Sequence, residues 1–337
     1  MAEPLLEVKD LKVHFPTEDG LVKAVDGVSF RVDRGETMGV VGESGSGKSV
    51  TFLTVMGLVT RKQAHIEGQV LFQGRDLLTT PAEEMRNIRG SKISMVFQDP
   101  MTSLHPYYKV GVQIVEAIRA HNPMPKRSAW EQAVEMLRRV GIPRPKDRAG
   151  QYPHEFSGGM RQRAMIAMAL SLNPDLLIAD EPTTALDVTV QAQILDLIDR
   201  MKDEFDASVV IITHDLGVVA ENADDVMVMY AGKPAEFGGR DDIYYRAHHP
   251  YTWGLMRSIS RMDQPRSERL RPIPGLPPSL IFVPPGCPFH PRCPYVMDVC
   301  KVEVPRLLTA DGKHASACHL PLAEKERIFQ EEVAVHQ

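Results

Sequence analysis

Apolar and polar side chains alternate along the chain up to about residue 35. The apolar positions are Leu6, Val8, Leu11, Val13, Phe15, Val25, Val28 and Phe30. This period of two is typical of β-strands with one buried face, and the sequence Thr-Glu-Asp-Gly at residues 17–20 is typical of a turn. The pattern therefore predicts N-terminal strands joined by a turn.

Four short segments are continuously apolar instead of alternating. They are residues 37–41, 175–179, 208–213 and 225–230. Such runs are typical of strands buried on both faces, as in a parallel α/β sheet. Helical periodicity dominates from about residue 112 to 172, and returns at 190–201 between two of the apolar runs. We therefore predict an α/β fold with a helical subdomain at about 100–172.

The character of the chain changes beyond about residue 255. Residues 271–278 and 283–286 are rich in proline, which fixes φ and lacks a backbone N–H, so they cannot form helix interiors. No internal repeat is apparent. We predict a main body at 1–255 and a small, loop-rich C-terminal extension at 256–337.

Composition narrows the class of protein. The 337 residues are 43% hydrophobic and 25% charged, which is ordinary for a globular protein with one large domain and a smaller appendage. The net charge of −5 gives no indication of a nucleic-acid-binding surface, so no nucleic acid partner is expected. The chain lacks an apolar run of about 18 residues and lacks signal-peptide features at its start. We expect a cytoplasmic protein, a location that allows docking on a membrane protein.

Residues 42–49 read Gly-Glu-Ser-Gly-Ser-Gly-Lys-Ser, which fits the phosphate-binding loop pattern G-x-x-x-x-G-K-[ST]. Glycines let backbone N–H groups turn toward an anion. Lys48 can supply a charge for the β- and γ-phosphates, and the Ser49 hydroxyl can ligate Mg²⁺. The apolar run before the loop predicts a strand, and residues 50–57 predict a helix whose N-terminus faces the phosphates.

Two further motifs carry chemistry. The apolar run at 176–179 is followed by Asp180 and Glu181. Asp180 can hold Mg²⁺ through water, and Glu181 can act as general base on an attacking water. Residues 156–160 read Phe-Ser-Gly-Gly-Met and precede a helical pattern. Ser157 can cap that helix, whose exposed N–H groups would form an anion site.

In this order, the motifs resemble those of the ATP-binding-cassette (ABC) family over about residues 5–255. The resemblance implies a P-loop ATPase fold with a parallel-sheet core, an N-terminal antiparallel β subdomain and a helical subdomain. It implies ATP contacts from Phe15, which would stack on adenine, and from Gly42, Glu43, Ser44, Gly45, Ser46, Gly47, Lys48, Ser49 and Val50. It implies Mg²⁺ ligation through Ser49, Gln98 and Asp180, and catalysis by Glu181, His214 and Gln98.

The same resemblance implies that two ATPase subunits share each ATP. The family signature is matched by Ser157, Gly158 and Gly159. The D-loop is matched by Ala-Leu-Asp at 185–187, which ends in Asp187. The resemblance implies that the signature and the D-loop contact the ATP of the opposing subunit. Met160 departs from the usual glutamine of the signature. ATP would hold the two subunits together, and hydrolysis would let them part.

All four cysteines lie in the C-terminal extension, at Cys287, Cys293, Cys300 and Cys318. Disulfides are disfavoured in a reducing cytoplasm, and the spacings are not the tight C-x₂-C pairs of zinc ribbons. Four thiolates suit either an iron–sulfur cluster or Zn²⁺. Spacing alone leaves that choice open, and buried inert thiols are a further alternative.

The cysteine pattern, together with His-Pro-Tyr at 249–251 and the proline-rich stretch, resembles the C-terminal extension of oligopeptide- and dipeptide-permease ATPase subunits, most closely D-type subunits of bacterial oligopeptide permeases. This resemblance implies a [4Fe-4S] cluster on the four cysteines. It also implies an importer motor at the cytoplasmic face of the bacterial inner membrane. The motor would pair with a related ATPase under two transmembrane subunits, served indirectly by an external peptide-binding protein. The alternatives are another cargo, such as nickel, and a soluble cassette ATPase without a transport role.

Overall fold

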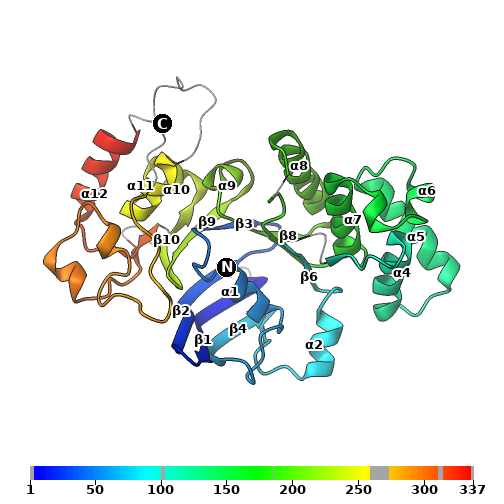
Figure 1. Ribbon diagram of the computed structural model, residues 1–337, viewed down its shortest axis with the longest axis horizontal. Helices are drawn as coiled ribbons and strands as arrows, with labels where there is room; N and C mark the ends of the chain where they lie inside the picture. The colour runs from blue at the N-terminus through cyan, green and yellow to red at the C-terminus, as the bar shows by residue number, and fades with distance from the viewer. Residues whose placement is uncertain (1–3, 100–102, 185, 259–272, 310–313, 335–337) are drawn as a thin grey trace. The chain divides into compact units, whose positions relative to one another are not determined.

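The computed structural model describes residues 4–99, 103–184, 186–258, 273–309 and 314–334 (Figure 1). The chain forms two compact units. The first contains Met1–Val32, Thr37–Leu78 and Thr213–Gln337, and the second contains Asp33–Glu36 and Thr79–Ile212. No helix in the described ranges has the length and apolar character needed to cross a bilayer.

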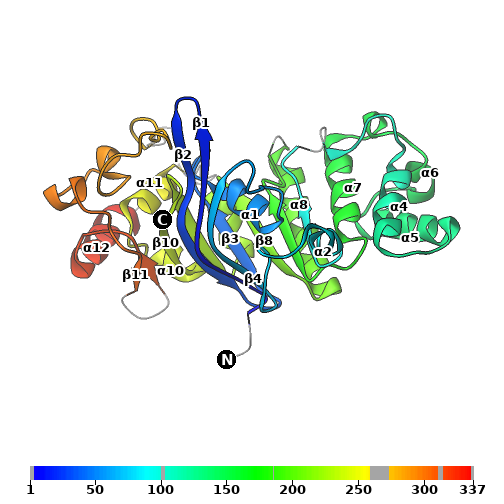
Figure 2. The same ribbon diagram turned by 90° about the horizontal axis from the view of Figure 1, so that it is seen from below.

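The first unit begins with an antiparallel sheet. Its strands are β1 (Leu6–Thr17), β2 (Gly20–Val32), β4 (His65–Phe72) and β5 (Arg75–Asp76), in the order β2-β1-β4-β5. Figure 2 shows β1 and β2 as a long hairpin with β4 on the other side of β1. Thr17 pairs with Gly20 at the end of the hairpin. The alternating pattern and the turn predicted from it are therefore confirmed.

A second sheet in the first unit carries the predicted buried strands. Strand β3 (Thr37–Val41) pairs in parallel with β9 (Asp225–Tyr230). The sheet continues from β9 through three antiparallel pairings, first to β10 (Lys233–Gly239), then to β12 (Ala315–Ser316) and last to β11 (Leu308–Thr309). The helices of this unit are α1 (Lys48–Val55), α9 (Leu216–Asn222), α10 (Arg240–Tyr245), α11 (Pro250–Arg257) and α12 (Leu322–Ile328). Single turns of helix span His290–Arg292, Asp298–Lys301 and Phe329–Val333.

Among its described residues, the second unit contains three parallel strands, β6 (Ile93–Val96), β7 (Leu176–Asp180) and β8 (Ser208–Thr213). Every residue of these strands is buried, as the continuous apolar runs at 175–179 and 208–213 predict for β7 and β8. The helices are α2 (Ala82–Ile88), α4 (Val110–His121), α5 (Lys126–Arg139), α6 (Pro145–Ala149), the single turn Pro153–Glu155, α7 (Gly158–Leu170) and α8 (Val188–Phe205). Helices α4 to α7 gather into one group (Figure 1).

The C-terminal extension shares the hydrophobic core of the first unit. Tyr251 and Trp253 of α11 are at most 1% exposed, and they belong to one buried cluster with Phe289, Phe329 and the cysteines. Residues 273–286 contain no helix or strand, as the prolines predict, while residues 271–272 of that stretch lie outside the described residues. The extension is therefore anchored by packing on α11 and β10.

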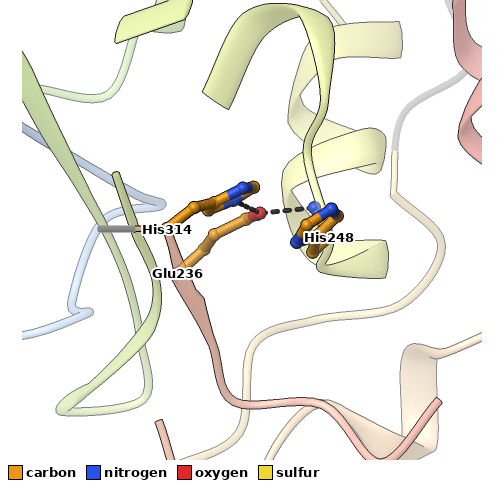
Figure 3. Close-up of side chains that lie close together, drawn as sticks. All are labelled: Glu236, His248 and His314. Atoms are coloured by element: carbon orange, nitrogen blue, oxygen red, sulfur yellow. Dashed lines mark hydrogen bonds and ion pairs between the residues drawn. The ribbon is translucent and has the colours of Figure 1, made fainter. Parts of the chain in front are cut away.

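A buried carboxylate ties three segments of the first unit together (Figure 3). Glu236 on β10 is fully buried; its Oε2 accepts from the backbone N of His249 at 3.2 Å and from Thr252 Oγ1 at 2.5 Å. Its Oε1 accepts from His314 Nε2 at 2.7 Å and from the backbone N of His248, whose ring stacks on His314. Two histidines and a carboxylate are a metal-ligating set. Here each carboxylate oxygen already accepts two hydrogen bonds, so the cluster joins β10, α11 and the segment before β12.

Candidate functional site

The phosphate-binding loop lies between β3 and α1, where the sequence predicts it. Lys48 is 5% exposed, and its ammonium donates to the carbonyls of Gly42 at 2.7 Å and Glu43 at 3.0 Å. Ser46 is 4% exposed, and its Oγ has no hydrogen-bond partner among the described residues. A buried hydroxyl without a partner costs free energy, so the loop fits a polar ligand such as a phosphate.

Two glycines of the loop are required by close backbone contacts. A Cβ added to Gly42 would lie 2.2 Å from the carbonyl oxygen of Met229, and one added to Gly47 would lie 2.2 Å from that of Ala24. Gly47 also has φ of 99°, which L side chains rarely adopt. These contacts hold the loop against β9 and β2 and start α1 directly at Lys48.

Glu43 is held from two sides by residues late in the chain. The guanidinium of Arg292 donates to both carboxylate oxygens, at 2.6 and 3.0 Å. The backbone N–H of Glu43 donates to the hydroxyl of Tyr251 at 2.8 Å. The phosphate-binding loop is therefore fixed through both the main chain and the side chain of this residue.

The first unit contains four other predicted residues of the nucleotide site, which lie on β1, in the first turn of α1 and directly after β8. Phe15 is half-buried on β1, opposite Val22 of β2. Ser49 and Val50 are half-buried in the first turn of α1, and His214 is exposed directly after β8.

The second unit brings Gln98 and Glu181 together. Asp180 ends β7 and is 6% exposed, and Glu181 follows with φ of 45°, its backbone N–H donating to the carbonyl of Ile212 at 2.8 Å. The Oε2 atom of Glu181 accepts from Gln98 Nε2 and from Thr184 Oγ1, each at 2.8 Å. These contacts fix the orientation of the Glu181 carboxylate.

The predicted signature begins α7. Ser157 is its N-cap, and its Oγ accepts from the backbone N of Met160 at 3.3 Å, which confirms the predicted cap. Asp187 caps α8 in the same way through Val190 N at 2.9 Å. A Cβ added to Gly159 would lie 2.9 Å from a methyl group of Val190, so the two helix starts lie together. Ala185 of the predicted D-loop lies outside the described residues.

The four cysteines are free thiols that lie within one buried region. Burial, together with the neighbouring charges of Cys318 and Cys300, raises the pKa of Cys287 to about 11. Burial and the other cysteines raise the pKa of Cys293 to about 12. Thiols that raise one another's pKa need a cation to exist as thiolates together. Four sulfur donors gathered in one buried region are a donor set that fits a thiolate-bound metal group.

Comparisons with known proteins agree with this geometry. Residues 25–184 match the ABC transporter family, and residues 235–300 match the C-terminal region of oligopeptide/dipeptide transporters. The oligopeptide transport ATP-binding protein OppD of Salmonella typhimurium is 51% identical over 96% of this chain and 96% of its own length. The chain belongs to the ABC transporter ATPases. As a member, it is an enzyme that hydrolyses ATP.

Further relatives of this ABC ATPase support the same family and fold. The dipeptide transport ATP-binding protein DppD of Bacillus subtilis is 53% identical over 94% of this chain and 95% of its own. Among solved structures, the dimeric ATP-binding cassette MJ0796, in a post-hydrolysis state with ADP and Pi, matches with a TM-score of 0.63 and 25% identity. That match covers 70% of this chain and 98% of MJ0796. The predicted fold class is confirmed.

The sequence did not reveal three residues that hold the site of this ABC ATPase. Thr184 binds the carboxylate of Glu181, and Tyr251 and Arg292 bind Glu43. Thr184 is near a predicted motif, so its position in the sequence was a usable signal. Tyr251 and Arg292 lie 208 and 249 residues from Glu43, and no local pattern links them to the loop.

Proposed function

We propose that this ABC ATPase drives the import of oligopeptides or dipeptides into a bacterial cell. It would act at the cytoplasmic face of the inner membrane, paired with a related ATPase under two transmembrane permease subunits. An external peptide-binding protein would deliver the cargo. The observation that carries the proposal is the match of residues 235–300 to the C-terminal region of oligopeptide/dipeptide transporters. The near full-length identity to proteins named OppD and DppD supports it.

The proposed division of labour follows the predicted domains, with residues 1–255 as the ATPase and 256–337 as the extension. In the ATPase, the loop from Gly42 to Ser49 would hold the phosphates, with Lys48 as the charge on the β- and γ-phosphates. Phe15 would stack on adenine, and Val50 would lie in the first turn after the loop. The buried Ser46 hydroxyl supports phosphate binding, because a phosphate oxygen would give it a partner.

For hydrolysis we assign Glu181 as the general base, with Gln98 and Thr184 orienting its carboxylate. His214 would position the γ-phosphate and the attacking water. Ser49, Asp180 and Gln98 would hold Mg²⁺, which neutralises charge that develops on the phosphates.

Two such subunits would complete each other's site. Ser157, Gly158 and Gly159 at the start of α7 would contact the ATP of the opposing subunit, with Asp187 beside them. The contact of Gly159 with Val190 supports this arrangement, since it places the start of α7 against the start of α8. A hydrolysis-deficient Glu181→Gln variant tests it. Mixed with its ATPase partner and ATP, this variant should form a stable nucleotide-dependent complex, and an absence of association would contradict the shared site.

We further propose that Cys287, Cys293, Cys300 and Cys318 hold a [4Fe-4S] cluster. The supporting observation is that all four sulfur donors lie in or against one buried cluster. Four thiolates can hold either an iron–sulfur cluster or Zn²⁺, so the metal content decides between the two. Anaerobic purification should give a brown protein with about four irons per chain. A colourless protein with one zinc per chain would support the alternative Zn²⁺ site instead.

A transport assay tests the cargo. Deleting the gene from its bacterium should abolish growth on an essential amino acid supplied as a peptide, and the wild-type gene should restore it. The Lys48→Ala variant is the matched control and should fail to restore growth. Normal peptide uptake with a loss of nickel uptake would favour the other cargo. Co-purification with ribosomes or DNA instead of membrane subunits would favour a soluble cassette ATPase.

A further inference from the structure

Arg292 connects the cysteine-bearing extension to the phosphate-binding loop. Its side chain is 5% exposed, and its two terminal nitrogens donate to the two carboxylate oxygens of Glu43, at 2.6 and 3.0 Å. Arg–carboxylate pairs with this forked geometry are among the stronger and more directional hydrogen-bonded pairs in proteins. The pair therefore fixes the distance and the orientation between the extension and the loop.

Arg292 is itself held in place by the segments around it. Its Nε donates to the carbonyl of Pro274 at 3.0 Å, and its Nη2 donates to that of Ile273 at 3.3 Å. Its Nη1 lies 3.4 Å from the hydroxyl of Tyr230, and the guanidinium carbon lies 5.9 Å from the centre of the Tyr230 ring. Its donors are therefore engaged by the extension and by the body of the unit, which holds the guanidinium in one orientation.

The same loop is bordered in two other places, by Tyr251 of α11 directly before the extension and by the extension itself. Tyr251 accepts the backbone N–H of Glu43. The proline-rich segment from Pro277 to Ile281 and the loop residues from Glu43 to Ser46 line one cavity of about 410 Å³. One wall of the space beside the loop thus comes from the extension.

On the other side, Arg292 lies next to the cysteines. It ends the single helical turn His290–Arg292, and Cys293 follows directly. The backbone N–H of His290 donates to the carbonyl of Cys287 at 3.0 Å, and that of Cys293 donates to the carbonyl of His290 at 3.3 Å. These two backbone hydrogen bonds tie the turn that carries Arg292 directly to Cys287 and Cys293.

We propose that Arg292 is a positioning residue of the nucleotide site that couples the state of the four cysteines to the affinity for ATP. The proposal rests on the proposed metal group at the cysteines. Coupling between two sites is reciprocal, so bound ATP must also stabilise the cysteine site. The cell would then have less ATP bound to its importer when the cysteine site is damaged or empty.

The first test measures the Kd of the purified full chain for a fluorescent ATP analogue. Arg292→Gln and Glu43→Gln should each weaken binding about 10-fold, and the double variant should be no worse than either. Arg292→Lys keeps one charged hydrogen bond and should recover part of the affinity. The control is Lys301→Gln, which removes an exposed ion pair with Asp298 in the same extension and should bind as the wild type does. Equal Kd values for Arg292→Gln, Glu43→Gln and the wild type would overturn the proposal.

The second test reads the coupling from the cysteine side. A thiol reagent is added to the protein as purified, with and without ATP, and the rate of cysteine labelling is followed. ATP should slow labelling about 5-fold in the wild type and in Lys301→Gln, and should have no effect in Arg292→Gln. Labelling of the wild type that is unaffected by saturating ATP would overturn the coupling. Metal analysis of the same sample separates this outcome from a failure of the proposed cluster, which would appear as a wild-type protein without iron.

Discussion

Replacing Glu236 tests whether one buried carboxylate joins the C-terminal extension to the rest of its unit. In Glu236→Ala, the side chain of Thr252, the backbone N–H of His249 and the ring of His314 lose their acceptor, and all three residues are at most 3% exposed. A buried donor without a partner costs about 2 kcal/mol, so the three together cost about 6 kcal/mol. That is comparable with the whole stability of many domains. We expect this variant to unfold or to be recovered in low yield.

Glu236→Gln is the informative second variant, because it keeps the shape and one acceptor oxygen. Its amide group faces two donors, so at about 2 kcal/mol for each we expect a loss of about 4 kcal/mol. Urea denaturation followed by the fluorescence of the buried Trp253 measures this loss. Glu326→Gln, an exposed change on α12, is the control and should change stability by less than about 0.5 kcal/mol. If Glu236→Gln were as stable as the wild type, the four hydrogen bonds that this carboxylate accepts would contribute nothing to the free energy of unfolding, and the reasoning would be refuted.

Three further predictions concern the site and its pH dependence. Glu181→Gln should lower the kcat of ATP hydrolysis about 10²- to 10⁴-fold with ATP affinity retained, and unchanged turnover in a phosphate-release assay would remove the general-base role. Burial lowers the pKa of His249 from 6.5 to about 4. Because the unfolded state then binds a proton at a higher pH than the folded state does, the free energy of unfolding should fall as the pH drops from 6.5 to 4, by up to about 3 kcal/mol. His249→Asn keeps a capping side chain for Tyr251 N and should lose that part of the pH dependence in denaturation curves; an identical pH profile would contradict it. Gly42→Ala should abolish nucleotide binding because its Cβ would meet the Met229 carbonyl, while Gly35→Ala, with φ of 73° and nothing within 4 Å, should bind ATP normally in the same titration.

Much of the fold could be predicted because its signals are local. The buried strand before the phosphate loop and the cap of α7 at Ser157 each depend on a few adjacent residues. Helix α1 begins at Lys48, two residues before the predicted start, because the loop glycines let the first turn form inside the motif. The contact between Gln98 and Glu181 could also be predicted, since the resemblance to the ABC family assigns both residues to one site.

The contacts of the extension could not be predicted, because they depend on side chains that are distant in sequence. The pair Arg292–Glu43 joins residues 249 positions apart, and Glu236 on β10 accepts from residues at the start of α11 and from His314 before β12. The proline-rich composition predicts irregular chain, which residues 273–286 show. It does not indicate that this irregular chain borders the phosphate-binding loop.

Strand β12 has a practical consequence for anyone who shortens this protein. It pairs with β10 through Ala315 and Ser316, and the N–H of Ala317 donates to the carbonyl of Ala235. A truncated version ending after α11 would leave that side of β10 without its hydrogen-bonding neighbour. Open strands of this kind recruit other polypeptides and seed insoluble assemblies. A minimal cassette made for crystallisation or screening should therefore keep the residues through β12 or carry a charged replacement on β10.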